Sequence, residues 1–230
     1  MTFLRAHRKL HIWLLADLML LAAFWIAREH RDWMNALADH VVLPLRLALS
    51  SVTYRVSFSV MEVLYALAAL AAIGYVAWSV AAVVRAGGRR ASRGYAAAVG
   101  AVCIGLTVYL LSSFLWGVSY YTDTFQDKSG VRAEEVSLPD LTAVTAWFAS
   151  NLTETADEVP RDAAGLFDVS LDDIFADSTA VYEGAEELFP FLAFEDRVPK
   201  RMFFSKVMSA MNFTGVYCAF TGESNINVDA

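Results

Sequence analysis

Three long apolar runs occupy the first half of this chain, and a more polar segment of similar length follows them. The runs cover residues 10–27, 58–84 and 95–118. Each is about long enough to cross a bilayer, which takes roughly 20 apolar residues. The third run is apolar around its whole circumference, whereas a core helix of that length in a soluble protein has a polar face. The pattern predicts three transmembrane helices in a membrane domain, residues 1–121, and an extracytoplasmic domain, residues 122–230.

The first apolar run has two interpretations, because the basic residues Arg5, Arg8 and Lys9 before it are also typical of a secretory signal peptide. The run is longer than the usual signal core of about 7 to 15 residues. Its exit, Trp25-Ile-Ala-Arg28, lacks a small-x-small cleavage pattern. These features favour an uncleaved signal anchor.

Residues 28–57, between the first two runs, carry a rough helical stripe of apolar side chains that Pro44 interrupts. The stripe consists of Trp33, Ala36, Leu37, His40, Val41, Leu43, Leu47 and Val52. An interfacial helix on the outer leaflet and a plain loop both fit this pattern.

Charge is divided unevenly along the chain, whose net charge is -7. Residues 1–118 contain 5 acidic and 11 basic residues, whereas the rest contain 20 acidic and 7 basic ones. Basic residues precede the first run and crowd the turn at residues 85–93, and short cytoplasmic loops are enriched in Lys and Arg. We therefore expect the N-terminus inside and the acidic C-terminal domain outside, although Arg28, Arg31, Arg46 and Arg55 in the first outer loop reduce the asymmetry. The expected partner is the lipid bilayer, and no nucleic acid is expected.

The C-terminal segment predicts helices followed by a short β-hairpin. Helices are expected after the capping-box-like starts at Ser137 and Ser170, with a shorter one around residues 201–211. Residues 216–220 and 224–228 predict two strands joined by a turn at Thr221-Gly222. The predicted fold class is mainly α: three transmembrane helices, then a small α-rich domain that ends in the hairpin.

Residues for chemistry are scarce in the C-terminal segment. All four histidines lie at or before residue 40, so residues 122–230 cannot form an ordinary zinc site or a Ser-His-Asp set by themselves. Cys103 falls in the third apolar run and Cys218 outside it, so two unpaired cysteines are expected. The acidic pairs Asp172-Asp173, Glu186-Glu187 and Glu195-Asp196 lack the loop of an EF-hand and predict solvated helix faces.

Asp17 lies within the first apolar run, where a charge costs roughly 2.5 to 3.5 kcal/mol on insertion scales. It is either a functional residue or a shallow one that reaches water.

The end of the chain, with Pro199-Lys200, Gly215-Val-Tyr217 and above all Phe220-Thr-Gly-Glu-Ser-Asn-Ile-Asn227, resembles a bacterial membrane family. This is the uncharacterised domain of unknown function family 3810. Its members have N-terminal membrane helices and an extracytoplasmic domain that resembles zinc metallopeptidases. Trp116-Gly-Val-Ser-Tyr120 looks like the family's Trp-Gly-x-Asn-Tyr element, with Ser119 in place of Asn, and Ala219 stands where the family tends to have Pro. The resemblance implies a location in the bacterial cytoplasmic membrane.

The family's His-Glu-x-x-His helix, which would hold zinc, is not encoded in these 230 residues. We therefore expect no catalytic or metal-ligating residue and no cofactor in this chain, with zinc only in a full-length protein that carries the motif. Either the sequence is an N-terminal fragment, as its abrupt end indicates, or it is a truncated, non-catalytic relative.

The resemblance implies a role for the predicted hairpin in the full-length protein. Its exposed edge would align an extended peptide or protein substrate, and Glu223, Asn225 and Asn227 are the candidate substrate-binding residues. The alternative for these residues is a turn at Gly222 with Asn side chains that satisfy backbone groups. The alternative function is a non-enzymatic, membrane-anchored module that binds an envelope ligand or a partner protein.

Overall fold

A computed structural model describes residues 5–131, 135–165, 167–193 and 197–229. The chain is mainly helical with one small sheet near its C-terminus, which confirms the predicted fold class. It divides into two compact units, one made of residues 1–122 and 200–230 and the other of residues 123–199. Residues 200–230 thus belong to the same unit as the apolar helices, although the polarity of the sequence groups them with the acidic segment.

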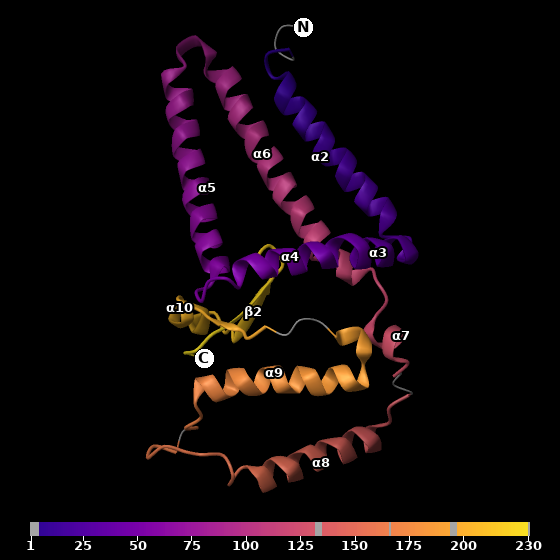
Figure 1. Cartoon of the computed structure of the whole chain (residues 1–230). Coiled ribbons are helices and arrows are strands. Elements are labelled where there is room, and N and C mark those ends of the chain that lie inside the picture. The colour runs from indigo at the N-terminus through magenta and orange to yellow at the C-terminus, as the bar shows by residue number, and fades with distance from the viewer. Residues whose placement is uncertain (1–4, 132–134, 166, 194–196, 230) are drawn as a thin grey trace. The chain divides into compact units, whose positions relative to one another are not determined.

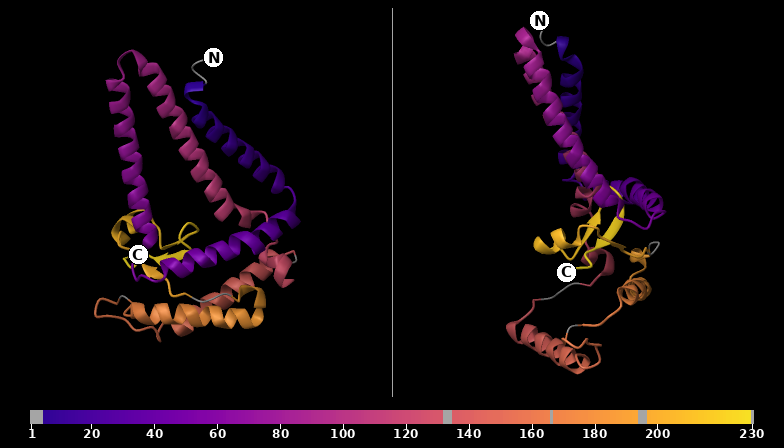
Figure 2. Two further views of the ribbon diagram at one scale, coloured as in Figure 1. Left: turned by 45° about the horizontal axis from the view of Figure 1, so that its top comes forward. Right: turned by 90° about the vertical axis from the view of Figure 1, so that its left-hand side faces the viewer.

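Three helices match the predicted apolar runs closely: α2 (Arg8–Ala27), α5 (Val60–Arg85) and α6 (Arg90–Leu115). All three are long and apolar enough to cross a membrane. Figures 1 and 2 show α5 and α6 as a hairpin, joined by the 3-10 turn η2 (Gly87–Arg89), with α2 running alongside α6. Their apolar side chains are largely exposed, as expected for helices whose neighbour is lipid.

Residues 31–53 form a nearly continuous helix that runs across one end of these three. It comprises α3 (Arg31–Leu37), the π-helical turn η1 (Ala38–Val42) and α4 (Leu43–Thr53). By length and composition this run is also a candidate membrane span. However, Figure 1 shows that it starts where α2 ends and finishes where α5 begins, at the same end of the bundle. A segment that begins and ends on one side does not cross, so this geometry favours the predicted interfacial helix over the plain loop.

Pro44 does not break this run, although it supplies no N–H group for a helical hydrogen bond. The π-helical turn directly before it absorbs the change in backbone geometry. Met34 and Val42 are the apolar side chains that the run buries, against Val118 of the 3-10 turn η3 (Gly117–Tyr120). Members of the predicted apolar stripe, such as Trp33, remain exposed and are free to contact the membrane.

Polar contacts join α2 to α6 inside the otherwise apolar bundle. Thr107 Oγ1 donates a hydrogen bond to Asp17 Oδ2 over 3.1 Å, and Trp13 Nε1 donates to Thr107 Oγ1 over 2.9 Å. A further bond of 2.7 Å connects His11 Nε2 and the Tyr95 hydroxyl. Asp17 is therefore buried against α6, where its carboxylate joins two membrane helices.

The C-terminal sheet has three strands in the order β1-β3-β2. The hairpin of β2 (Gly215–Cys218) and β3 (Glu223–Ile226) follows the prediction, with Cys218 opposite Glu223. A two-residue strand, β1 (Lys200–Arg201), pairs in parallel with β3. Two residues are too few to show the alternating pattern by which a strand is predicted from sequence. The expected third helix is α10 (Ser205–Ala210). Met61 of α5, Met202 and Cys218 form the core of this part.

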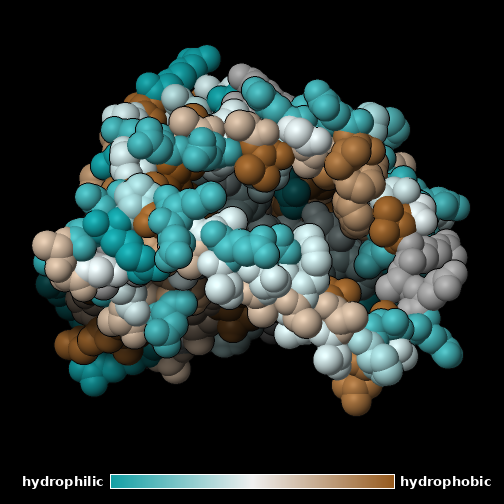
Figure 3. Space-filling model, turned by 90° about the horizontal axis from the view of Figure 1, so that it is seen from below, coloured by the Kyte–Doolittle hydropathy of each residue, from teal (hydrophilic) through white to brown (hydrophobic). Residues whose placement is uncertain are grey.

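The second unit contains α7 (Phe125–Ser129), α8 (Leu138–Thr155), α9 (Leu171–Leu188) and the 3-10 turn η4 (Pro190–Leu192). Ser137 forms the expected capping box, and Ser170 accepts a hydrogen bond from the Asp172 N–H at the start of α9. The apolar residues of α8 are exposed. Figure 3, which views the molecule from below, shows hydrophobic residues scattered among hydrophilic ones on that face.

Candidate functional site

The predicted site residue Glu223 is fully buried where the C-terminal sheet meets the start of α5. Its Oε1 accepts hydrogen bonds from Lys200 Nζ over 2.5 Å and from the Val60 N–H over 3.2 Å. Its Oε2 accepts one from the Met61 N–H over 2.8 Å. The first backbone N–H groups of a helix have no intrahelical partner and carry partial positive charge. Glu223 therefore satisfies these groups of α5 from a strand more than 160 residues away in sequence.

Lys200, the partner of Glu223, uses all three of its donors. Besides Glu223, its Nζ donates to the backbone carbonyls of Thr53 and Phe58, each over 2.9 Å. The ammonium group also lies 4.9 Å from the centre of the Tyr54 ring. The lysine side chain is nearly as buried as Glu223, so removing either residue would leave the other as a buried group without its ion-pair partner.

A second buried carboxylate makes the reverse connection. Glu62, in the first turn of α5, accepts hydrogen bonds from the N–H groups of Phe203 (2.7 Å) and Phe204 (2.8 Å), just before α10. Its own N–H donates to the hydroxyl of the N-cap residue Ser59. Glu62, Lys200 and Glu223 together form what we call the carboxylate clamp, through which each of two segments satisfies backbone groups of the other.

The turn of the hairpin fits closely against α4. Gly222 has a φ of +66°, and a Cβ atom there would lie 2.8 Å from the Arg46 carbonyl oxygen and 2.9 Å from the Ser50 nitrogen. Nearby, Thr53 Oγ1 donates to the Thr221 carbonyl over 2.9 Å. Glycine is therefore required at this turn both by the backbone conformation and by the space available.

The other two predicted site residues are also buried. Asn227 donates to Ser209 Oγ and to the Phe213 carbonyl, each over 2.8 Å, and accepts from the Asp229 N–H. Asn225 donates to Met61 Sδ over 3.7 Å, while its Oδ1 has no hydrogen-bond partner in the part of the chain that the structure describes. The three predicted residues thus lie on one strand and its continuation. Of the three, Asn225 is the one that still offers an unused polar atom.

β2 is an outer strand, and no other described strand pairs with its far edge, which we call the open edge of the sheet. The Asn227 N–H donates a hydrogen bond to the Thr214 carbonyl. Because hydrogen-bonded and non-hydrogen-bonded pairs alternate along an antiparallel ladder, Gly215 and Tyr217 direct their backbone N–H and C=O groups away from β3. The Tyr217 ring lies 5.9 Å from that of Trp116, between ring centres. Burial raises the pKa of the Tyr217 phenol, although the nearby Arg46 guanidinium opposes this shift. The phenol is therefore neutral at physiological pH.

The described residues do not fit a zinc site. Among them, no group of three or more His, Cys, Asp and Glu side chains could hold a metal ion. The buried carboxylates of the clamp are already committed to Lys200 and to backbone N–H groups. Both cysteines are buried and free, as expected. Glu195 and Asp196, one of the acidic pairs, lie outside the described residues.

Two members of the clamp were not identified from the sequence as site residues. Glu62 gave a signal, because it is the single charge in the second apolar run. Lys200 lies in the Pro199-Lys200 element that carries part of the family resemblance, but nothing local indicates that it pairs with Glu223.

Comparison with known protein families gives a match over most of the chain. The family model described as "Protein of unknown function (DUF3810)" matches residues 40–230. No curated protein and no solved structure matches the chain. The matched region includes α4, α5, α6 and the whole carboxylate clamp. Because the match covers most of the chain and all of this site, the protein belongs to that family.

Proposed function

We propose that this chain is a multi-pass membrane anchor that fixes a small peptide-binding sheet at the bilayer surface. The observation that carries the proposal is the combination of a buried clamp on one side of the sheet and an open strand, β2, on the other. An extended peptide can add to such an edge through backbone hydrogen bonds, with side-chain pockets adding specificity. The rigid attachment to α5 lowers the entropy cost of ordering the edge.

The charge distribution supports an orientation with the N-terminus inside and the sheet outside a bacterial cytoplasmic membrane. The end of the bundle that holds the α5–α6 turn has several arginines and is the expected cytoplasmic side. The sheet lies at the opposite end, beside the start of α5.

If the full-length protein is an enzyme, this chain is the anchoring part of an extracytoplasmic zinc metallopeptidase. The open edge of β2 would then align the substrate next to the catalytic centre. Since the described residues do not fit a zinc site, the ligands would have to come from another segment or another chain. The second candidate is a non-enzymatic module that captures an extended peptide or protein at the same edge.

The experiment measures binding of fluorescein-labelled, unstructured decapeptides of random sequence to the protein in detergent. Tyr217→Pro removes an outward N–H without removing a ladder bond to β3, and should abolish binding. Tyr217→Ala removes the ring but keeps that N–H, and should retain most of the binding. Equal affinity of both variants and the parent would exclude the edge as the binding site.

A zinc and proteolysis assay of the full-length gene product separates the two candidates. Stoichiometric zinc together with peptide cleavage would support the peptidase. Peptide binding without zinc would support the non-enzymatic module.

A further inference from the structure

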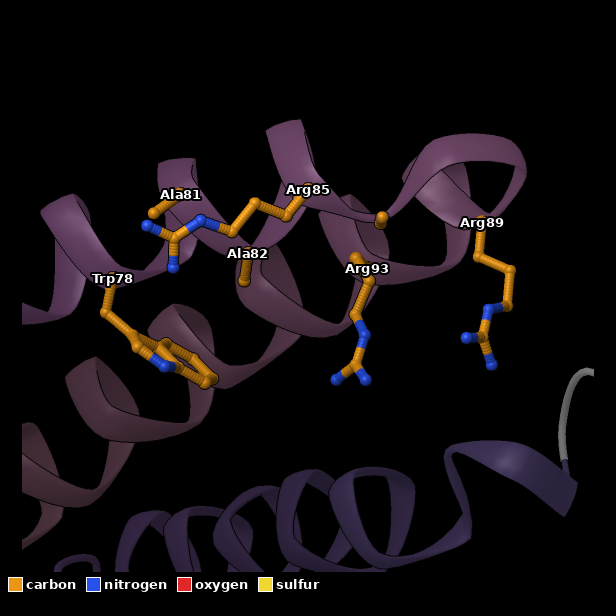
Figure 4. Close-up of a pocket in the computed structure, with 7 residues that line it drawn as sticks. Trp78, Ala81, Ala82, Arg85, Arg89 and Arg93 are labelled. Carbon is orange, nitrogen blue, oxygen red and sulfur yellow. The ribbon is translucent and has the colours of Figure 1, made fainter.

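A basic cavity lies at the opposite end of the bundle from the sheet, at the turn between α5 and α6. It has a volume of about 360 Å³ and is lined by Trp78, three small residues and the side chains of Arg85, Arg89 and Arg93. Figure 4 shows these arginines extending from the end of α5, the turn and the start of α6. Arg89, Arg93 and the Trp78 indole project to the same side in this view.

No carboxylate of the described residues forms an ion pair with the positive charges of this cavity. Within the described residues, none of the three arginines has an ion-pair partner. The sequence explains this, because residues 63–122 contain no Asp or Glu. Three guanidinium groups around one cavity repel one another, so an anion that enters it is stabilised by all three.

An apolar crevice continues from the basic cavity into the bundle. It has a volume of about 240 Å³ and shares Trp78, Ala82 and Arg93 with the cavity. Its walls come from α2, α5 and α6, and include Leu10 and Ile104. The crevice is thus lined largely by side chains that an acyl chain can contact.

Two contacts show how the crevice is kept in shape. The Tyr75 hydroxyl donates to the Ala97 carbonyl over 2.7 Å, which ties α5 to α6. Gly100 allows this approach, because a Cβ there would lie 2.5 Å from the Tyr75 hydroxyl oxygen. The wall also holds Ser79, whose buried Oγ has no hydrogen-bond partner among the residues that the structure covers.

The basic cavity lies at the depth of lipid headgroups. The α5 helix has 26 residues and is therefore about 39 Å long, compared with about 30 Å for the hydrocarbon core. Arg85, its last residue, thus reaches the membrane–water boundary when the helix spans the bilayer. Trp78 lies about two turns deeper on α5, and therefore just inside the hydrocarbon region.

We propose that this cavity and crevice form a binding site for one anionic phospholipid, a site separate from the sheet. The phosphate group sits between Arg89 and Arg93, with Arg85 adding to the positive charge of the cavity, and one acyl chain enters the crevice beside Trp78 and Ala82. A free phosphate shares the first set of contacts but not the second. The adjoining apolar crevice therefore favours the lipid as the ligand.

The test uses the full chain in detergent and native mass spectrometry, with dioleoylphosphatidylglycerol and dioleoylphosphatidylcholine as probes. The anionic lipid should remain bound and the zwitterionic one should not. Each arginine near anionic lipid contributes roughly a fivefold gain in affinity, so Arg89→Gln with Arg93→Gln should weaken binding about thirtyfold. Arg55→Gln, an exposed arginine beyond the other end of α5, is the matched control and should leave the affinity unchanged.

Two further arms distinguish the ligand sources and guard against misfolding. Ala82→Phe fills the junction of the two cavities and should reduce lipid binding without changing the binding of inorganic phosphate. Arg89→Lys with Arg93→Lys keeps the charge and should retain most of the lipid affinity. Equal retention of both lipids, or the same affinity in the glutamine double variant and the Arg55→Gln control, would overturn the proposal. Binding of phosphate with no effect of Ala82→Phe on lipid retention would also overturn it, in favour of a free-phosphate site.

Discussion

Replacing Glu223 by Ala is expected to release the C-terminal sheet from α5. The change leaves the Lys200 ammonium buried without its anion, and it leaves the N–H groups of Val60 and Met61 without their acceptor. Removing one partner of a buried ion pair typically costs about 3–5 kcal/mol. That cost is large relative to the stability of a small sheet, so the sheet should open often while the membrane helices remain folded.

Cys218 reports this opening directly. It is free and 2 % exposed, and it lies in the core between the sheet and α5. In a Cys103→Ala background, the rate of Cys218 labelling by a thiol reagent measures the fraction of open molecules. A loss of 3–5 kcal/mol corresponds to a rate increase of roughly 150-fold to several thousandfold. Glu187→Ala, an exposed carboxylate on α9, is the control and should leave the rate unchanged.

A double-mutant cycle with Lys200→Met tests the cause of the effect. Each single change leaves one buried charge or backbone group unsatisfied, whereas the double change removes both charges. The double variant should therefore label more slowly than the sum of the two single effects predicts. Labelling of the Glu223→Ala protein at the parent rate, or strict additivity in the cycle, would refute the assignment of the clamp.

Three other changes follow from single contacts. A non-glycine residue in the left-handed conformation costs roughly 1–2 kcal/mol, and Gly222→Ala should destabilise the hairpin by more than this, because the new Cβ meets the backbone of α4. Thermal unfolding in detergent measures the loss of stability, and stability equal to that of the parent would contradict the prediction. Thr107→Val removes the donor to Asp17 and should cost about 0.6–1.7 kcal/mol in unfolding by a denaturing detergent, with no loss if the bond is unimportant. The Ser137 hydroxyl and, to a smaller extent, the Ser137 backbone N–H lower the pKa of Asp140 below its usual 3.8. The stability that ionised Asp140 gives to α8 is therefore present above pH 3.8, and it is lost as the pH falls through the lower folded-state pKa. Ser137→Ala should raise the Asp140 pKa in an NMR titration, and an unchanged pKa would contradict the capping assignment.

The elements that the sequence predicts well are those with a strong local signal. A continuous apolar run is enough to identify α5, and the capping box at Ser137 identifies the start of α8. The hairpin is signalled by alternation and by Gly222, whose left-handed backbone needs glycine.

The clamp was harder to predict because it depends on contacts between distant segments. Glu223 and Lys200 are 23 residues apart, and Glu62 lies more than 130 residues before either, so no spacing rule connects them. The family resemblance makes Glu223 a candidate for substrate binding, and in the structure its carboxylate accepts hydrogen bonds from the start of α5. The apolar stripe within residues 28–57 indicates a helix, but its periodicity does not indicate that Met34 and Val42, which lie outside the stripe, are buried. A helix at a membrane surface has two apolar neighbours, lipid and protein, and the pattern does not separate them.

The most direct test of the central claim, that the C-terminal sheet is fixed to the start of α5, is site-specific photo-crosslinking in the membrane-embedded protein. The Phe203 ring lies 6.4 Å from that of Phe58, between ring centres, so p-benzoylphenylalanine at position 203 should crosslink to residues near 58. The same probe in place of Trp78, near the other end of α5, is the control and should give no such product. A crosslink from position 203 to residues 54–66 is the predicted result, and crosslinks confined to residues 123–199 would contradict the account.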